Sequence, residues 1–308
     1  MLIVTDVGNK AAVFPLQLLG FDVDFVNSVQ FSNHTGYQGG FEGDVLNGEQ
    51  LVSLLKGLER NSLLGNVGHL LTGYIGSETF LRSVLDVLKT LRRHNPDIRF
   101  VCDPVLGDSG KFYVPPSLVP IYRDEVFPFA DIVTPNQFEV EQLTGIRVKS
   151  ISDAKSACKA LHVLGPQTVL ITSAILDDNE YSQQQQQSNV KEKEQIVIIA
   201  SQRRSSSSSN SSSKIGISQE MWCVDCPMIP GNFTGTGDLC AALLLAWSFK
   251  EPENISFVLE KVISTMYSII KKTVESAGNT TASQELKLIQ SKTIIENPPS
   301  IFKARQIS

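Results

Sequence analysis

Residues 67–103 decide the fold class predicted for this chain. They read V-G-H-L-L-T at 67–72, E-T-F-L-R-S-V-L-D-V-L-K-T-L-R-R at 78–93 and R-F-V-C-D at 99–103. The outer two segments are short apolar runs that favour strands, and the middle segment is an amphipathic stretch of helical length. A strand, a helix and a second strand in succession predict two parallel strands of one sheet.

The same alternation continues on both sides of this unit. We expect further strands at 21–29, 131–134 and 168–173, and further helices at 10–19, 49–61, 137–143, 153–164, 235–249 and 254–272. The runs 195–201 and 221–228 have no helix between them and are expected to pair as an antiparallel edge hairpin. The prediction is a single α/β domain over residues 1–308, with a mostly parallel central sheet and helices on both faces.

The composition indicates a globular domain in a reducing compartment. Hydrophobic residues make up 42% of the chain, which is ample for a core, and the net charge of −5 disfavours nucleic acid as a partner. No apolar run reaches membrane-spanning length, so we expect a cytoplasmic protein without a membrane partner. The five cysteines are odd in number and scattered, which argues against a disulfide framework.

Cys223 and Cys226 form a lone C-x-x-C. They are either half of a zinc site or redox pair, or ordinary strand residues that do not face a shared site. No second C-x-x-C or histidine pair is present to complete a metal site, so we favour the second interpretation.

Two low-complexity segments interrupt the second half of the chain. Gln183–Gln187 is a run of glutamine, and Ser205–Ser213 is serine broken by Asn210. Such segments bury no apolar area, and strand-like patterns resume around them. We therefore interpret about 180–192 and 204–214 as surface insertions within the domain.

The first candidate for chemistry is T-G-T-G-D at 234–238, which opens a predicted helix that is apolar nearly all round. Glycines let the backbone approach a ligand closely, and the N–H groups at the start of a helix favour an anion such as a phosphoryl group. Asp238 is placed to accept a proton from an attacking hydroxyl. The alternative is an ordinary helix start with an acidic first turn.

Two more polar segments follow the strands at 99–103 and 131–134. The first carries Asp103 and Asp108, which suit Mg²⁺, although a plain polar turn would have the same composition. The second carries Asn136 and Glu139, which also match a capping box. Ligands bind at the carboxyl ends of parallel strands, so we expect these segments to meet the 234–238 segment at one site.

His34 is a further candidate, as a catalytic base in S-N-H-T at 32–35. No partner signature of a catalytic triad surrounds it, so we interpret it as a structural or substrate-packing histidine.

Taken together, these segments resemble pyridoxal kinases of the ribokinase-like group. The resemblance covers residues 7 to about 275 and rests on V-G-N-K-A-A-x-F-P-L-Q-L-L-G-F at 7–21, V-N-S-V-Q-F-S-N-H-T-G-Y at 26–37, L-T-G-Y at 71–74, C-D-P-V-L-G-D at 102–108, Y-V-P at 113–115, T-P-N-Q-F-E at 134–139, G-P-x-T-V-x-I-T-S at 165–173 and T-G-T-G-D-L at 234–239. F-S-N-H-T-G-Y and T-P-N-Q-F-E are the most specific of these motifs. A hydroxymethylpyrimidine or sugar kinase is the alternative within the group, and F-S-N-H-T-G-Y argues against both.

The resemblance implies a transfer of the ATP γ-phosphate to the 5′-hydroxyl of pyridoxal, pyridoxine or pyridoxamine. Asp238 would be the base, and Gly235, Thr236 and Gly237 would form the anion hole. The residues that would line the vitamer pocket, together with Asp238, are Val7, Phe31, Thr35 and Tyr74.

The resemblance also implies ATP as co-substrate, Mg²⁺ or Zn²⁺ in its place, a monovalent cation such as K⁺, and a homodimer. The residues that would contact ATP are Asp103, Tyr113, Thr134, Asn136, Thr172, Ser173 and Thr236. The residues that would serve the metal are Asp108, Glu139 and Asp103.

The N-terminus departs from the family pattern. Similar enzymes begin with an apolar strand and a serine-bearing loop, whereas only six residues precede Val7 here, none of them serine. Residues 2–4 could supply only a stub of that strand, so we expect a central strand to be missing, which would expose the backbone of its neighbours. A truncated, inactive homologue that binds vitamers or a partner subunit is therefore the alternative function.

Overall fold

The computed structural model describes residues 2–5, 8–35, 37–177, 194–205, 217–276 and 285–307, and for residues 2–5, 205 and 217 only the backbone. Val7 and nearly all of the two expected insertions lie outside the described residues.

The centre of the described fold is a nine-stranded sheet in the order β13-β12-β11-β10-β9-β6-β5-β1-β2. Its strands are β1 (Leu2–Thr5), β2 (Asp24–Asn27), β5 (His69–Thr72), β6 (Arg99–Cys102), β9 (Ile132–Val133), β10 (Thr168–Ala174), β11 (Gln195–Ser205), β12 (Ile217–Pro227) and β13 (Arg305–Gln306). Neighbours from β2 to β10 are parallel, and β11, β12 and β13 are antiparallel to their neighbours. The predicted mostly parallel sheet with an antiparallel hairpin is confirmed.

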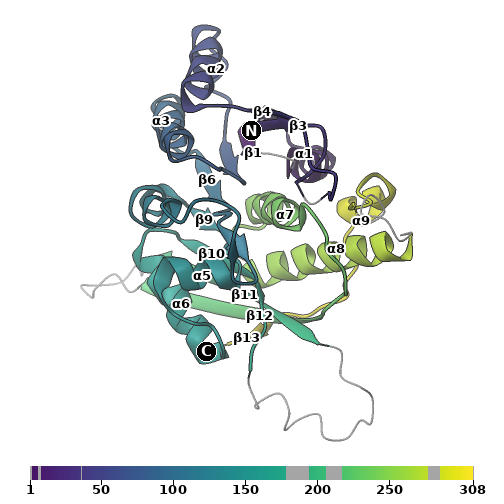
Figure 1. Cartoon of the computed structure of the whole chain (residues 1–308). Coiled ribbons are helices and arrows are strands. Elements are labelled where there is room, and N and C mark those ends of the chain that lie inside the picture. The colour runs from purple at the N-terminus through teal and green to yellow at the C-terminus, as the bar shows by residue number, and fades with distance from the viewer. Residues whose placement is uncertain are drawn as a thin grey trace, which may run out of the picture.

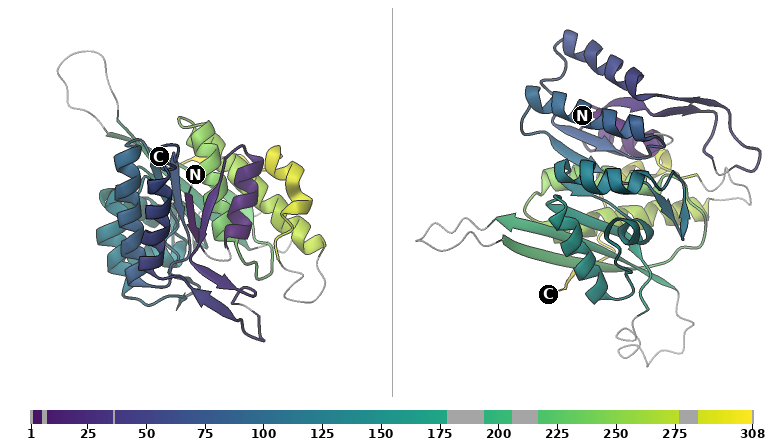
Figure 2. Two further views of the ribbon diagram at one scale, coloured as in Figure 1. Left: turned by 90° about the horizontal axis from the view of Figure 1, so that it is seen from above. Right: turned by 60° about the vertical axis from the view of Figure 1, so that its left-hand side comes forward.

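Helices cover both faces of this sheet (Figures 1 and 2). One face carries α2 (Gly48–Arg60), α3 (Glu78–His94), α4 (Leu118–Ile121), α5 (Gln137–Thr144) and α6 (Ile151–Val163). The other face carries α1 (Gly8–Leu18), α7 (Thr236–Lys250), α8 (Ile255–Glu275) and α9 (Lys292–Glu296). Alternate strand residues feed the two cores: Phe100 packs on the first face and Val101 on the second.

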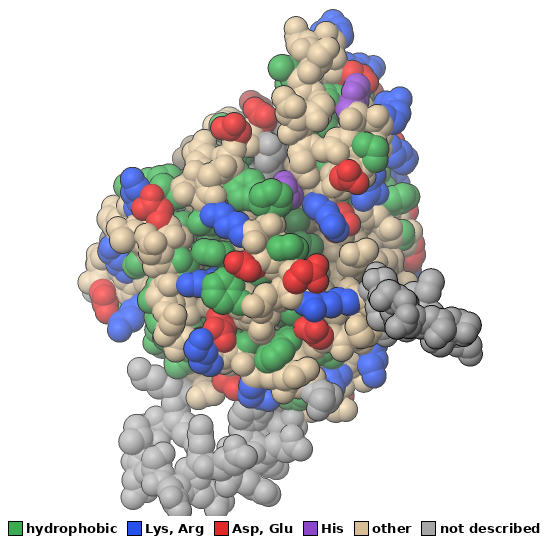
Figure 3. All heavy atoms as spheres, turned by 180° about the vertical axis from the view of Figure 1, so that it is seen from behind, with side chains coloured by type: hydrophobic (Ala, Val, Ile, Leu, Met, Phe, Trp, Pro, Cys, Tyr) green, Lys and Arg blue, Asp and Glu red, His purple; other side chains and the backbone are tan. Residues whose placement is uncertain are grey.

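Helix α7 is the buried helix that its composition predicts. Every residue from 239 to 246 is buried, because α7 packs between α1, α8 and the sheet. No helix of the described residues is both long and apolar enough to cross a membrane. Figure 3 shows acidic and basic side chains interspersed on the back face, in keeping with the absence of a basic field in the sequence.

The two cysteines of the C-x-x-C lie on opposite faces of β12. Cys223 belongs to the core under α2–α6, and Cys226 belongs to the core under α1, α7 and α8. The interpretation as ordinary strand residues is confirmed, since an offset of three residues along a strand reverses the face.

The expected loss of a central strand is wrong. Strand β1 lies inside the sheet, with residues 2–4 opposite 70–72 of β5 and residues 2–5 opposite 24–27 of β2. Four residues, three of them β-branched, are enough to fill this position, because both neighbours supply a parallel ladder.

The single strand expected at 21–29 is divided in two. After β2, the chain leaves the sheet and forms β3 (Val29–Phe31), which pairs with β4 (Gly43–Val45) in a separate hairpin that projects from the sheet (Figure 2). A second small hairpin, β7 (Gly107–Asp108) with β8 (Lys111–Phe112), follows β6. Both hairpins begin at the carboxyl ends of parallel strands, and they flank the site described below.

Candidate active site

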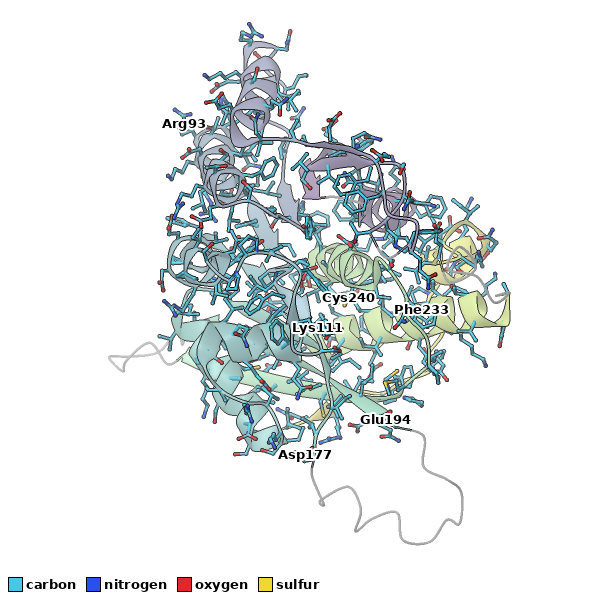
Figure 4. The ribbon with its side chains drawn as sticks, in the orientation of Figure 1. Arg93, Lys111, Asp177, Glu194, Phe233 and Cys240 are labelled. Carbon is cyan, nitrogen blue, oxygen red and sulfur yellow. The ribbon has the colours of Figure 1, made fainter. Side chains whose placement is uncertain are left out.

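The start of α7 is the centre of the candidate site. Gly235 precedes the helix with a φ of +84°, in the left-handed region that favours glycine, and a Cβ on it would lie 3.0 Å from the Cβ of Ala11 in α1. Asp238 lies in the first turn of α7. Figure 4 labels Phe233 just before this turn and Cys240 just after it. The helix therefore presents its N–H groups and a carboxylate at the same end.

Asp103 brings β6 to this end of α7. Its side chain is buried, its Oδ1 accepts a hydrogen bond from Thr134 Oγ1 at 2.9 Å, and its Oδ2 would lie 3.2 Å from a Cβ on Gly237. Burial raises the pKa of Asp103 well above its usual range, and the charges of Glu139 and Asp238 raise it further. The absence of a side chain on Gly237 lets the helix turn approach this carboxyl group.

Glu139 organises the loop between β6 and β7. Its Oε1 accepts from Leu106 N at 2.9 Å and Gly107 N at 3.5 Å, and its Oε2 accepts from Asn136 N at 2.8 Å. Burial raises its pKa to about 8, against these hydrogen bonds. The expected capping box is present, since Asn136 Oδ1 accepts from Glu139 N at 2.9 Å. Asn136 Nδ2 also donates to Gly107 O at 2.8 Å, so the cap holds β7 in place.

Asp108 and Tyr113 lie at the outer edge of the site. Asp108 is exposed on β7, where its Oδ1 accepts from Ser109 N at 2.7 Å. Tyr113 follows β8 and is 59% exposed, with burial and the charge of Asp108 raising its pKa. Both side chains are thus accessible to a ligand that arrives from solvent.

Thr172 and Ser173 lie at an irregularity near the end of β10. The register with β11 shifts between Ile171 and Ala174, and Thr172 N donates instead to Pro135 O at 3.1 Å. A bulge at a strand end commonly redirects side chains toward a site. Here it joins β10 to the segment that carries Asn136.

A cavity of about 500 Å³ adjoins the start of α7. Its lining comprises Lys10, Ala11, Phe31, Ser32, Asn33, His34, Tyr37, Thr234, Gly235, Glu285, Leu286 and Leu288. Of the residues predicted for the vitamer pocket, Phe31 is part of this lining, and its ring lies 4.4 Å from that of Phe41. Tyr74 and Thr35 lie outside the lining, with Tyr74 half-buried and its carbonyl bound by Ser28 Oγ at 3.2 Å.

His34 stands at the rim of this cavity. Its Nδ1 lies 3.5 Å from Thr234 Oγ1, and its ring lies 4.6 Å from the ring of Tyr37. These contacts are with a hydroxyl group and an aromatic ring, and the packing role of His34 stays a prediction.

The family model for phosphomethylpyrimidine kinase matches residues 65–212. A pyridoxal kinase of Arabidopsis thaliana is 46% identical over 307 residues, covering 98% of this chain and 91% of the relative. A pyridoxal kinase of Homo sapiens is 40% identical over 310 residues, covering 97% of this chain and 93% of the relative.

The chain belongs to the pyridoxal kinase family. Solved structures of the family share its fold. Pyridoxal kinase from Leishmania donovani in complex with ADP and pyridoxamine superimposes with a TM-score of 0.83 at 30% identity, covering 100% of this chain and 99% of that one. A Plasmodium falciparum member with AMP-PNP and PL gives a TM-score of 0.80 at 25% identity, covering 100% and 98%.

Three residues with ionisable side chains line the cavity of this chain but were not predicted from the sequence, namely Lys10, Tyr37 and Glu285. Lys10 and Tyr37 stand inside quoted motifs, so their motifs could have drawn attention to them. Glu285 gives no such signal, because its neighbours in sequence form no motif and its partners lie some 250 residues away.

Proposed function

We propose that this chain transfers the γ-phosphate of ATP to the 5′-hydroxyl group of pyridoxal, pyridoxine or pyridoxamine. The observation that carries the proposal is the position of Asp238, in the first turn of α7 and next to the Gly235 turn that lines the cavity. An acceptor hydroxyl in the cavity would lie near a carboxylate base and an anion-binding helix start together. Phosphoryl transfer needs this combination of positioning and charge stabilisation.

In the proposed reaction, Asp238 accepts the proton of the hydroxyl group as its oxygen attacks the γ-phosphorus. The new P–O bond forms while the bond to the β-phosphate oxygen breaks, and ADP leaves. Gly235, Thr236 and Gly237 supply backbone N–H groups that stabilise the charge on the transferring group. Phe31 lines the cavity and provides an apolar contact for the ring of the acceptor. Val7, Thr35 and Tyr74 remain proposed vitamer contacts, with Thr35 and Tyr74 outside the cavity lining.

For ATP, we propose contacts with residues at the carboxyl ends of β6, β9 and β10, after β8 and at the start of α7. They are Asp103, Tyr113, Thr134, Asn136, Thr172, Ser173 and Thr236. Support comes from the bulge at Thr172 and Ser173 and from the exposure of Tyr113, which leave these groups available to a ligand.

For the metal, we propose Mg²⁺, or Zn²⁺ in its place, held by one or two of the carboxylates of Asp103, Asp108 and Glu139 together with the nucleotide phosphates, and a monovalent cation such as K⁺ nearby. No group of three or more His, Cys, Asp or Glu side chains suited to a metal occurs among the described residues. That fits Mg²⁺, which is commonly held by one or two carboxylates and the nucleotide phosphates. The raised pKa values of Asp103 and Glu139 also fit, since a cation favours their ionised forms. Bound Mg²⁺ would neutralise charge on the phosphates.

We further propose that the chain works as one domain in the cytoplasm and as a homodimer. The proposal rests on the continuous sheet and on the resemblance to the family. Size-exclusion chromatography with light scattering measures the oligomeric state.

The deciding experiment measures phosphorylation of pyridoxal by the 308-residue protein with Mg-ATP, beside Asp238→Asn. Loss of a positioned base is expected to lower kcat by about 10²–10⁴-fold. Asp97→Asn, which changes an exposed aspartate outside the site, should retain wild-type turnover. Hydroxymethylpyrimidine serves as a rival acceptor, and preference for it would overturn the proposed substrate class. Vitamer binding without turnover would instead support an inactive homologue.

A further inference from the structure

We propose that Glu285 is a positioning residue that fastens the substrate loop and α1 around the acceptor cavity. The substrate loop is defined here as residues 31–35 and 37–40, which carry Phe31 and Thr35. The proposal rests on the proposed function, because it assigns Glu285 a role in acceptor binding for that reaction.

The Glu285 carboxylate joins three segments that are far apart in the chain. Its Oε1 accepts a hydrogen bond from Tyr37 Oη at 2.8 Å, and its Oε2 accepts one from Lys10 Nζ at 3.1 Å. Tyr37 belongs to the substrate loop and Lys10 to α1. We call Glu285 with these two partners the Glu285 tether.

The substrate loop can respond to the tether as a unit, because it is braced internally. Asn33 Nδ2 donates to Gly40 O at 2.9 Å, Gly40 N donates to Tyr37 O at 3.1 Å, and Ser32 N donates to Glu42 O at 2.8 Å. A restraint on Tyr37 therefore acts on Gly40 and, through Gly40, on Asn33, which lies two residues after Phe31.

The tether also reaches the phosphate-binding turn. Tyr37, held by Glu285, contacts the ring of His34 at 4.6 Å, and His34 Nδ1 lies 3.5 Å from Thr234 Oγ1. Thr234 directly precedes Gly235. Glu285, Tyr37, His34 and Thr234 thus form a continuous series of contacts from the C-terminal segment to the start of α7, along the wall of the cavity.

The protonation states suit a lasting tether at neutral pH. Partial burial acts to raise the pKa of Glu285, but the hydrogen bonds from Tyr37 and Lys10 and the charges of Lys10 and His34 outweigh it, so the pKa is lowered. The hydrogen bond to Glu285 raises the pKa of Tyr37, so the phenol keeps its proton. The ion pair itself is largely exposed, with Lys10 78% and Glu285 37% exposed, and such pairs contribute little to global stability. The role of the tether is therefore local.

The test compares Glu285→Ala, Tyr37→Phe and the double variant with wild type. We expect the KM for the vitamer to rise about 10-fold in each single variant, with kcat and the KM for ATP within about 2-fold of wild type. The vitamer KM of the double variant should not exceed that of the more impaired single variant, because both single variants remove the contact between Tyr37 and Glu285. Glu285→Gln keeps an acceptor for the Tyr37 hydroxyl group, so its KM for the vitamer should lie between the values of wild type and Glu285→Ala.

Glu260→Ala is the matched control, and hydrogen–deuterium exchange is a measurement that does not depend on turnover. Glu260 makes a comparable C-terminal contact away from the cavity, with Lys303 Nζ at 2.9 Å and Ala304 N at 3.0 Å, so Glu260→Ala should leave the vitamer KM unchanged. Hydrogen–deuterium exchange of the peptide over 31–42 should increase in Glu285→Ala and Tyr37→Phe and stay constant in Glu260→Ala.

The two readouts separate the two proposals. If wild type phosphorylates no vitamer, the proposed function fails, and exchange still tests the tether. If wild type is active and Glu285→Ala changes neither the vitamer KM nor the exchange of the loop, the tether is overturned and the kinase proposal stands.

Discussion

Gly8 lies so close to Asp238 that no side chain fits between them. A Cβ built on Gly8 would come within 1.8 Å of Asp238 Oδ1 and 2.0 Å of its Cγ. Helix α1 begins at this glycine and α7 begins two residues before Asp238, so the two helix starts converge on one carboxylate. The G-N-K segment thereby sets the position of the proposed base.

Gly8→Ala is expected to displace Asp238 and lower kcat for pyridoxal by at least about 10²-fold, since a shift of 1 Å in a reacting group has that effect. Steady-state kinetics with circular dichroism would measure turnover and folding together. Gly57→Ala is the matched control, because Gly57 lies inside α2 with no atom within 4 Å of the added methyl. That variant should keep full turnover and gain about 0.5–1 kcal/mol of stability. Full activity in Gly8→Ala would contradict the assigned position of the base.

Asn136→Ala tests whether the cap of α5 also serves nucleotide binding. It removes the acceptor for Glu139 N and the donor to Gly107 O, so we expect a loss of about 1 kcal/mol in stability and a raised KM for ATP. Asn47→Ala removes an equivalent capping box at the start of α2, where Asn47 Oδ1 accepts from Gln50 N at 2.9 Å. We expect the two variants to lose similar amounts of stability. Only Asn136→Ala should show a raised KM for ATP. Equal KM values for ATP in both variants would show that Asn136 only caps α5 and does not serve nucleotide binding.

The strand and helix alternation could be predicted because each element carries its own periodicity. The apolar positions of 78–93 and the apolar run at 99–103 report burial directly. The sequence does not predict the hairpin of β3 and β4 or the short strand β13, because two or three residues are too few to show a period. Their pairing depends on segments brought near by the rest of the fold.

In the candidate site, too, some residues could be predicted from the sequence and others depend on the fold. Asp103, Asn136, Glu139 and Asp238 all follow or open predicted elements, and the rule for the carboxyl ends of parallel strands was enough to group them. Glu285 lies outside every predicted element. Its contact with Tyr37 becomes visible only when the C-terminal segment is placed beside α1.

The five cysteines are expected to be unreactive in the native protein. All are buried and free, and burial raises the pKa of Cys158, Cys223, Cys226 and Cys240 to about 12. A thiol reagent such as Ellman's should therefore react slowly without denaturant and with all five thiols after unfolding. Val163→Cys places a thiol at a position that is 82% exposed and should add one fast equivalent. Fast reaction in the wild type would show that the cores around β12 open more readily than their burial indicates.

His162 is expected to make stability depend on pH. It is buried between α6 and β11, with Nδ1 2.8 Å from Pro166 O and Nε2 2.7 Å from Ser201 Oγ. Since a carbonyl oxygen only accepts, Nδ1 carries the proton and Nε2 accepts from the serine hydroxyl. Burial lowers the pKa of His162, although the hydrogen bond to Pro166 opposes the shift, and Arg203 lowers it further.

Proton linkage determines the direction in which the free energy of unfolding changes with pH. Below the pKa of about 6.5 for an unfolded histidine, the unfolded chain binds a proton that folded His162 does not, so the free energy of unfolding falls as the pH falls. The contribution is complete above pH ~6.5 and is lost toward lower pH by at most about 1.4 kcal/mol per pH unit. Urea unfolding of wild type and His162→Gln between pH 7.5 and 5.5 measures it as the difference between their slopes. His94→Gln, which changes a surface histidine near Glu59, leaves His162 in place and should keep the wild-type slope. Equal slopes in wild type and His162→Gln would mean that His162 is protonated equally in the folded and unfolded chain.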